Sequence, residues 1–283
     1  MSSELRKIVL FDMDGTLTPP RKPIEERVIP VLASLSEHAR IGIVTGSGLD
    51  YINEQCSILW NASPLQRRLW NLPTIDPGKI TLLPCNGTQR YEWDKEHEVW
   101  GQVFGVSMKE ELGLLTYKKL VRSILELQSK VVNTNPELPL SGTFLQYRGS
   151  LLNWCMMGRD FSDGERDQFM AMDEGSRFRK DLLQRLRRSL GRQRVREITM
   201  VLGGQCSIDI YPTGWDKTYA LKHFNDYQKI WFLGDKCKEG GNDHLIYEML
   251  RPLGTSFEVE GPSDTMQVIR EFVIPSVSGK KNE

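Results

Sequence analysis

The sequence predicts an α/β protein in which a doubly wound parallel sheet forms the core and a smaller antiparallel α+β domain is inserted into it. Short continuous apolar runs at 7–11 (KIVLF), 41–44 (IGIV) and 229–233 (KIWFL) have the pattern of strands buried on both faces. Between the last two runs, strand-like segments meet in pairs at glycines, as hairpins do. The chain of 283 residues is long enough for two such domains.

The core elements are predicted in the order of the chain. Apolar residues at helical spacing predict a helix over 24–38, between the first two strands. The stretch 58–77 contains three prolines and is interpreted as a loop-rich excursion, after which 79–83 forms a strand. The last elements are a strand at 229–233, a helix at 243–250, a strand at 256–259 and a helix at 263–272. The core is expected to comprise residues 1–104 and 213–283.

The inserted segment, 105–212, has a different pattern. Helices are predicted at 108–130 and 176–190, the second with leucines along one face. One hairpin joins 142–148 to 151–157 at Gly149-Ser150, and another joins 197–202 to 206–211 at Gly203-Gly204. Helices beside antiparallel hairpins predict a separate α+β domain.

The composition argues against two classes of partner. Lys plus Arg equals Asp plus Glu at 37 each, so no net field draws the chain to nucleic acid or to an acidic membrane. The nine basic residues within 177–196 are interpreted as the polar face of the helix that carries the leucines. No apolar run approaches the ~20 residues of a membrane helix. We therefore expect no nucleic-acid partner and no membrane partner.

The cysteines indicate a reducing environment. Five are scattered through the chain, and none forms a C-x-x-C pair. This pattern favours reduced thiols over a disulfide framework or a zinc site. Charged residues Glu4, Arg6 and Lys7 lead straight into the first strand, which is not the pattern of a signal peptide. A cytoplasmic location is expected.

Two acids, Asp12 and Asp14, follow the first strand in the string DMDGTLT. In open α/β sheets, ligands bind beyond the carboxyl ends of the strands, so chemistry is expected here. Two close carboxylates repel each other without a cation, and Mg²⁺ is a hard ion that takes oxygen ligands and accompanies phosphate. The alternative is a plain turn at the end of a strand, where Asp and Gly are common.

Two weaker signals lie elsewhere in the core. Ser47 follows the second strand, where its hydroxyl suits either a phosphoryl oxygen or a helix cap. Lys217 follows Trp215-Asp216, and a lysine beside a phosphoryl group neutralises developing charge. A lone lysine is more often a solvated surface residue, so this signal depends on its context.

A stronger signal follows the strand at 229–233. Asp235 stands at the end of that strand, and Asp243 opens the next helix after a glycine-rich loop. Asp243 is equally suited to capping that helix. A metal site formed by Asp12, Asp14 and Asp235, with Asp243 in support, explains all four acids together.

These elements, in this order, resemble the haloacid dehalogenase (HAD) superfamily. Five strings closely resemble the eukaryotic-type phosphomannomutases within it: FDMDGTLTPPR, GTFLQYR, NWCMMGRDFSDGER, GGQCSIDIYPTGWDK and GDKCKEGGNDH. The resemblance extends from Phe11 to His244 and includes the inserted segment, so it is more specific than D-x-D-G alone. It implies a HAD-like core with an α+β cap that binds the sugar phosphate.

The resemblance implies a role for each matching core residue. Asp12 would accept the phosphoryl group as an aspartyl phosphate, and Asp14 would be the general acid/base for the sugar oxygen. Ser47 and Lys217 would contact the transferred phosphoryl group. Magnesium would be held by Asp12, Asp235 and the backbone carbonyl of Asp14, with Asp243 in support.

The resemblance also implies how the substrate is held. Arginine binds phosphate bidentately, and polar side chains bind sugar hydroxyls. The implied substrate-binding residues are Arg21 in the core and Arg148, Arg159, Arg166, Ser207 and Asp209 in the cap. For Asp209, an ordinary outward-facing strand position is the alternative. A homodimer through the cap is implied only by analogy.

Three features depart from the family pattern. The family has Pro-Glu-Asn-Gly where this chain has Pro84-Cys85-Asn86-Gly87. The stretch 58–77 is longer than expected. The segment LIYEMLRPLG after His244 lacks the pattern that supplies a second cation site, so no second metal is assigned.

The expected function is interconversion of mannose 6-phosphate and mannose 1-phosphate, through an aspartyl phosphate and a hexose 1,6-bisphosphate that also serves as activator. Glucose phosphates are alternative substrates. A HAD-type sugar-phosphate phosphatase shares every catalytic group and is the nearest alternative. A catalytically silent binding protein is disfavoured, since it has no reason to hold Asp12, Asp14, Lys217 and Asp235 together at a cost.

Overall fold

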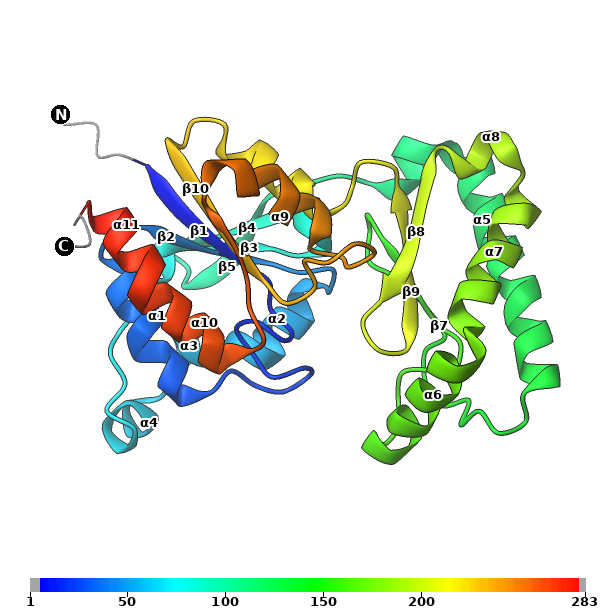
Figure 1. Ribbon diagram of the computed structural model, residues 1–283, viewed down its shortest axis with the longest axis horizontal. Helices are drawn as coiled ribbons and strands as arrows, with labels where there is room; N and C mark the ends of the chain where they lie inside the picture. Colours follow the sequence, from blue (N-terminus) through cyan, green and yellow to red (C-terminus); the bar gives the residue numbers. More distant parts are fainter. Residues whose placement is uncertain (1–5, 280–283) are drawn as a thin grey trace. The chain divides into compact units, whose positions relative to one another are not determined.

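The computed structural model describes residues 6–279 and divides the chain into two compact units (Figure 1). The first unit comprises Met1–Gly105 and Asp216–Glu283, and the second comprises Val106–Trp215. The chain leaves the first unit once and returns to it, so the second unit is an insertion. None of the helices within 6–279 is long and apolar enough to cross a membrane.

The first unit is built on a seven-stranded sheet of order β11-β10-β1-β2-β3-β4-β5. Its strands are β1 (Lys7–Phe11), β2 (Arg40–Val44), β3 (Ile80–Leu83), β4 (Gln89–Asp94), β5 (Val99–Gly105), β10 (Lys229–Gly234) and β11 (Ser256–Glu258). The five strands from β11 to β3 are parallel, as predicted. Strands β4 and β5 extend the sheet antiparallel and were not predicted, because neither is a continuous apolar run.

Helices cover both faces of this sheet (Figure 1). One face packs against α1 (Ile29–Ser36), α10 (Pro262–Val268), a π-helical turn (Ile269–Val273) and α11 (Ile274–Ser278). The other face packs against α9 (His244–Leu250) and a 3₁₀ segment (Lys217–Phe224). Further short elements are α2 (Leu49–Cys56) and 3₁₀ turns at Glu26–Val28, Pro77–Lys79, Cys85–Gly87 and Arg251–Leu253. Alternate residues of β1 accordingly enter two separate cores, as a strand buried on both faces requires.

The stretch 58–77 is not a continuous loop. It contains α3 (Ile58–Asn61) and α4 (Pro64–Leu69). Helix α4 begins with a capping box between Ser63 and Gln66, with Pro64 in its first turn. Proline is favoured at this position, because its missing N–H has no partner there in any case. The interpretation of Pro64 as a loop signal was wrong for this reason, whereas Pro73 does lie in an irregular segment, 70–76.

The second unit is an antiparallel sheet of order β6-β7-β9-β8 with helices. Its strands are β6 (Leu145–Tyr147), β7 (Leu152–Cys155), β8 (Ile198–Gly203) and β9 (Ser207–Pro212). Its helices are α5 (Met108–Thr134), α6 (Asp163–Ser176), α7 (Phe178–Leu190) and α8 (Arg192–Val195). Both predicted hairpins are confirmed. Helix α6 was not predicted, because it is mostly polar and buries only Phe169 and Asp173.

One of the basic residues assigned to a solvated helix face is buried. Arg179 is 8% exposed, and its Nε donates to Asp173 Oδ2 at 2.7 Å. Its Nη1 donates to the backbone carbonyl of Ser207 at 3.1 Å. The face assignment was therefore wrong at Arg179, which instead fixes α7 to α6 and β9.

Candidate active site

Two of the predicted acids lie at the carboxyl ends of neighbouring parallel strands. Asp12 directly follows β1 and donates its backbone N–H to the carbonyl of Leu233 in β10, at 2.9 Å. Asp235 directly follows β10. Because parallel strands end at the same edge of a sheet, the register of β1 against β10 brings these carboxylates together.

Lys217 joins two of the acids. Its Nζ lies 2.5 Å from Asp12 Oδ1 and is also bonded to Asp243 Oδ1. Asp243 Oδ2 accepts the backbone N–H of Lys236 at 3.1 Å. Asp243 stands at the N-cap position of α9 but makes no side-chain cap there. The capping alternative is thereby wrong, and Lys217 is not a solvated surface residue, since it is 1% exposed.

The arrangement of these side chains fits a divalent cation. Oxygen atoms of Asp12, Asp235 and Asp243 lie within 4.8 Å of one another. Three carboxylates, two of them buried, lie around one buried ammonium, which leaves negative charge in excess. Asp235 Oδ1 is buried and has no hydrogen-bond partner among residues 6–279. A hard ion such as Mg²⁺ accepts oxygen ligands and supplies the missing charge. Asp12, Asp235, Asp243 and Lys217 are together called the acid cluster below.

The electrostatics of the acid cluster follow from its burial. Burial raises the pKa of Asp12, and the neighbouring Asp243 carboxylate raises it further, against the opposing effect of Lys217. Burial raises the pKa of Asp235 as well. Burial by itself lowers the pKa of Lys217, but the Asp12 and Asp243 carboxylates outweigh it and leave that pKa raised. The ammonium therefore stays charged at neutral pH.

Gly15 makes room for this arrangement. Its φ of +84° lies in the left-handed region, which side chains with a Cβ rarely adopt. A Cβ at this position would lie 2.4 Å from Asp235 Oδ2. The glycine of the DMDGT string therefore allows the loop after β1 to approach the loop after β10.

Asp14 is held apart from the acid cluster. Its Oδ1 accepts the backbone N–H of Arg21 at 2.7 Å and the side-chain amide of Gln55 at 3.2 Å. Gln55 is 2% exposed, and its Oε1 in turn accepts the hydroxyl of Thr18 at 2.7 Å. The Asp14 carboxylate is not one of the three clustered acids. The contribution of its backbone carbonyl to a metal site is a separate point and stays a prediction. Gln55 was missed, since a glutamine within a short helix carries no signal by itself.

Ser47 lies in the loop after β2, at the same edge of the sheet as Asp12. Its backbone N–H is bonded to Thr45 Oγ1 at 3.1 Å, and its carbonyl accepts the N–H of Cys85 at 2.9 Å. The adjacent Asn86 donates its N–H to the carbonyl of Thr45 at 2.7 Å. The 85–87 turn, where this chain departs from the family pattern, therefore braces the Ser47 loop through its backbone.

In the second unit, Asn153 on β7 brings three predicted substrate-binding residues together. Its amide nitrogen donates to Ser207 Oγ at 2.8 Å and to Asp209 Oδ1 at 2.7 Å. Its amide oxygen accepts Nη1 of Arg159 at 2.5 Å. Ser207 and Asp209 are two positions apart on β9, so they share one face of the sheet. These four residues are called the Asn153 network; Asn153 was missed, although it lies in the quoted string NWCMMGRDFSDGER.

The other two predicted cap arginines lie on different elements of the second unit. Arg148 follows β6, and its Nε and Nη2 donate to Gln146 Oε1 at 3.1 and 2.9 Å. Arg166 lies in the first turns of α6, where its Nη1 is 2.9 Å from Asp163 Oδ1. Arg166 Nε is buried and has no hydrogen-bond partner among the residues that the structure describes.

A family model described as eukaryotic phosphomannomutase matches residues 28–275. The chain belongs to this family. Proteins named phosphomannomutase are 31% identical over 275 residues in Spinacia oleracea and 33% identical over 261 residues in Arabidopsis thaliana. The first alignment covers 97% of this chain and 98% of the relative, and the second covers 92% and 93%. The resemblance read from the sequence motifs is confirmed.

Solved structures support the fold of this phosphomannomutase-family chain. An IMP-nucleotidase mutant of Plasmodium falciparum has a TM-score of 0.56 at 14% identity, covering 97% of this chain and 68% of its own. A trehalose-6-phosphate phosphatase related protein has a TM-score of 0.52 at 14% identity, covering 97% and 100%. At this identity the likeness concerns the fold alone, and it confirms the predicted α/β class.

Proposed function

We propose that this protein is a phosphomannomutase that interconverts mannose 6-phosphate and mannose 1-phosphate through an aspartyl phosphate on Asp12. The observation that carries the proposal is the acid cluster at the carboxyl edge of the sheet, in a chain whose family model spans residues 28–275. Four charged side chains are held together there at an energetic cost, which a purely structural role does not require.

In the first half of the reaction, a carboxylate oxygen of Asp12 attacks the phosphorus atom of a sugar phosphate. The phosphorus–oxygen bond to the sugar breaks, and Asp14 donates a proton to the leaving sugar oxygen. The contacts of Asp14 with Gln55 and with the backbone of Arg21 orient its carboxyl group for this transfer. Lys217 offsets negative charge on Asp12 and on the transferred group.

In the second half, the phosphoryl group of Asp12 passes to the free hydroxyl of a hexose monophosphate, whose proton Asp14 accepts. The product is a hexose 1,6-bisphosphate, which turns over and returns its other phosphoryl group to Asp12. Bound Mg²⁺, held by Asp12, Asp235 and the Asp14 carbonyl with Asp243 in support, supplies positive charge for the phosphoryl oxygens. A hexose 1,6-bisphosphate is therefore the expected activator.

The proposed role of the second unit is to hold the non-reacting part of the sugar. Arg159 is the arginine of the Asn153 network, and Ser207 and Asp209 suit sugar hydroxyls. Arg21, Arg148 and Arg166 complete the proposed phosphate-binding set. A second set of phosphate ligands suits a bisphosphate intermediate better than simple hydrolysis, which favours a mutase over a phosphatase.

Two further parts of the proposal concern the whole protein. We propose a cytoplasmic location, supported by five buried cysteines that form no disulfide among the described residues. We also propose a homodimer through the second unit, by analogy with the family. Light scattering of the purified protein tests the dimer, and a monomer at all concentrations contradicts it.

The decisive experiment follows both products in one sample. The protein is incubated with Mg²⁺, mannose 1-phosphate and a catalytic amount of glucose 1,6-bisphosphate, and mannose 6-phosphate and free phosphate are measured together. Mannose 6-phosphate that forms faster than free phosphate, and only with the bisphosphate, supports a mutase. Free phosphate and mannose without mannose 6-phosphate would make the protein a phosphatase.

Asp12→Asn is expected to abolish transfer while the protein stays folded, because the amide cannot form the acyl phosphate. Circular dichroism checks the fold, and mass spectrometry after incubation with the bisphosphate checks for the phosphoenzyme. Transfer at the wild-type rate in this variant would exclude Asp12 as the nucleophile.

A further inference from the structure

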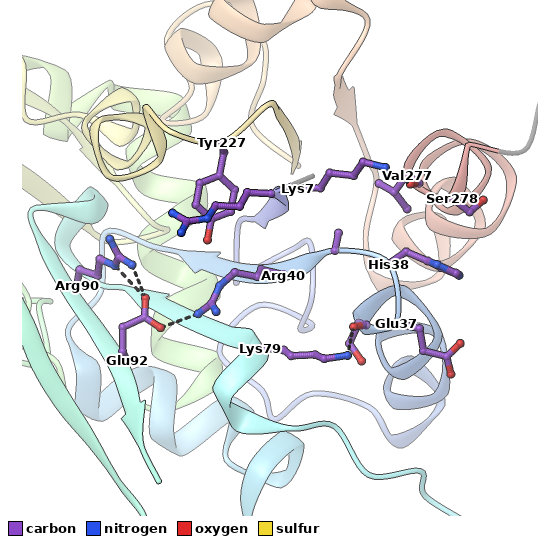
Figure 2. Close-up of a pocket in the computed structure, with 13 residues that line it drawn as sticks. Lys7, Glu37, His38, Arg40, Lys79, Arg90, Glu92, Tyr227, Val277 and Ser278 are labelled. Atoms are coloured by element: carbon purple, nitrogen blue, oxygen red, sulfur yellow. Dashed lines mark hydrogen bonds and ion pairs between the residues drawn. The ribbon is translucent and has the colours of Figure 1, made fainter. Parts of the chain in front are cut away.

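A second site lies at the opposite edge of the sheet from Asp12. A pocket of about 730 Å³ opens at the amino ends of three adjacent strands, beside Lys7 of β1, Arg40 of β2 and Lys79 just before β3 (Figure 2). The register places Arg40 beside Ile8 and Ile41 beside Ile80, so these three basic residues are neighbours across the strands. The volume is within the range of small-molecule sites.

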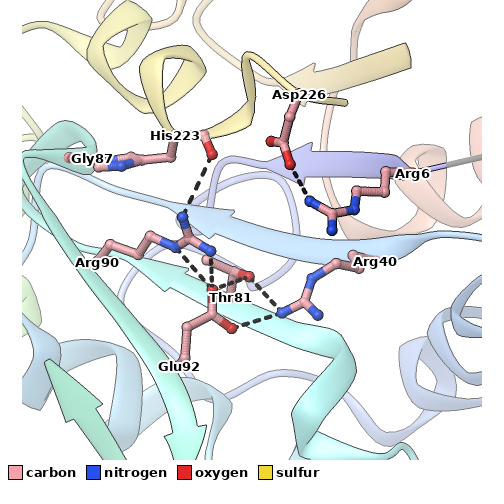
Figure 3. A network of polar contacts seen from close by, with 8 residues as sticks. All are labelled: Arg6, Arg40, Thr81, Gly87, Arg90, Glu92, His223 and Asp226. Carbon is pink, nitrogen blue, oxygen red and sulfur yellow. Dashed lines mark hydrogen bonds and ion pairs between the residues drawn. The ribbon is translucent and has the colours of Figure 1, made fainter. Parts of the chain in front are cut away.

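The lining of this pocket carries an excess of positive charge. Five cationic side chains face two carboxylates: Arg6, Lys7, Arg40, Lys79 and Arg90 against Glu37 and Glu92. Arg40 and Arg90 share the single carboxylate of Glu92, at 2.7 and 2.8 Å (Figure 3). Arg6 is paired with Asp226. Within residues 6–279 neither lysine forms an ion pair and the arginines share Glu92 and Asp226, so the lining carries more cationic than anionic side chains.

Several donors in the pocket are unused within residues 6–279. Lys7 Nζ donates once, to the carbonyl of Val277 at 2.6 Å, and Lys79 Nζ donates once, to the carbonyl of Ser36 at 2.7 Å. Neither ammonium forms an ion pair there, so each has two N–H groups left. Arg40 uses only Nη2, towards Thr81 and Glu92, and its buried Nε has no partner.

Helix capping explains part of this arrangement. Ser36 and Val277 lie in the last turns of α1 and α11, and lysines near helix C-termini favourably meet the negative ends of the helix dipoles. That role accounts for one hydrogen bond from each lysine. It does not account for Arg40, whose bonds within residues 6–279 go to Thr81 and Glu92 in β3 and β4, or for the open volume between these groups.

We propose that this pocket binds a small, multiply charged phosphate anion. Lysine ammonium groups bind phosphate as point charges, and Arg40 adds a planar donor whose Nη1 has no partner among the described residues. The half-buried ring of Tyr227 forms part of the wall and suits an organic group attached to the phosphate (Figure 2).

The pocket is separate from the acid cluster. The five residues of β1 span roughly 16 Å, at about 3.3 Å per residue, between Lys7 and Asp12. None of the lining residues belongs to the acid cluster or contacts Asp14. Binding in this pocket is therefore independent of the proposed reaction, and its failure would leave that proposal intact.

The test uses inorganic pyrophosphate with the full-length protein in metal-free buffer. Binding is measured by calorimetry, and its place by shifts of assigned backbone amides. Lys7→Gln combined with Lys79→Gln removes two charges but keeps an amide donor for each helix end. The matched control combines Lys238→Gln with Arg251→Gln, which removes two exposed charges elsewhere in the first unit. Arg40→Gln is a further variant, which leaves Arg90 paired with Glu92.

The expected result is a loss of affinity of about tenfold or more in the double variant and in Arg40→Gln, with the control within about twofold of wild type. Amide shifts are expected at 36–40 and 79 in the wild-type protein. Shifts confined to the loops around Asp12, Ser47 and Lys217, or equal affinity in the double variant, would overturn the proposal. Absence of binding up to ~10 mM pyrophosphate would overturn it too.

Discussion

The acid cluster and the Asn153 network hold their charges in different ways. In the acid cluster, three carboxylates share one buried lysine, and an oxygen of Asp235 has no partner among the described residues. In the Asn153 network, one arginine and one carboxylate are linked through a neutral amide that uses both donors and its acceptor. The first group is incomplete without a cation, whereas the second is balanced within itself.

This difference matches the roles proposed for the two units. A site for phosphoryl transfer gains from uncompensated charge, since a cation and a phosphoryl group complete it. A surface that binds sugar hydroxyls gains from side chains that are already oriented, because less conformational entropy is then lost on binding. Lys217→Met and Arg159→Ala test this contrast directly, while Arg179→Met and Gln55→Leu test contacts to Ser207 and to Asp14.

The largest effect is expected for Lys217→Met. Loss of the ammonium leaves three carboxylates in a buried place, and breaking a buried ion pair in this way costs about 3–5 kcal/mol. Burial raises the pKa of Asp12, so protonation relieves the repulsion as pH falls; the loss is largest near about pH 7 and shrinks towards about pH 5.

Urea denaturation with EDTA and with Mg²⁺ measures this effect, and Mg²⁺ is expected to recover part of the loss. The control is Lys95→Met, at a lysine whose side chain is largely exposed, with a change below about 0.5 kcal/mol. A loss in Lys217→Met that is the same at both pH values and unaffected by Mg²⁺ would contradict the charge argument.

A loss of about 3 kcal/mol is expected for Arg179→Met in the second unit. The substitution leaves Asp173 buried without its ion pair. It also removes the N–H group that donates to the Ser207 carbonyl. Thermal denaturation compares it with Arg185→Met, an exposed position on the same helix. Equal stability of the two variants would place Arg179 on the solvated face after all.

Gln55→Leu is expected to lower kcat by about ten- to a hundredfold with little change in KM, because Asp14 loses a side chain that orients it. Steady-state kinetics with mannose 1-phosphate measure the two constants. Gln267→Leu, at an exposed glutamine of α10, is the control. A rise in KM alone would indicate that Gln55 serves binding and not the orientation of Asp14.

The smallest effect is expected for Arg159→Ala, which should raise KM for monophosphates by about tenfold and leave the fold unchanged. Arg159→Lys keeps the charge but loses the planar fork, so an intermediate KM is expected. Kinetics with mannose 1-phosphate and a competition assay with the bisphosphate check both. An unchanged KM in both variants would remove Arg159 from the substrate-binding set.

Much of the core fold was predictable from the sequence of each strand taken alone. The runs KIVLF, IGIV and KIWFL are apolar because each strand is covered by helices on both faces, and this is a local property of the sequence. The β4–β5 extension was not predictable in this way, because a strand with an exposed face lacks such a run.

Part of the site was predictable for the same reason. Asp12 and Asp235 each follow a buried strand, so their place at the carboxyl edge of the sheet follows from the strand pattern. Their partners were not predictable from spacing. Gln55 and Asp14 are 41 positions apart, Asn153 and Asp209 are 56 apart, and polar side chains of these types are common on protein surfaces.

The sequence by itself determined which core strands are buried and which acids stand at strand ends, because periodicity and apolar runs are local. Only the tertiary structure decided that Lys217 lies buried between Asp12 and Asp243, that Arg179 is internal, and that Lys7, Arg40 and Lys79 line one pocket. The physical reason is that burial and charge pairing depend on strand order and packing, which bring together residues far apart in the chain.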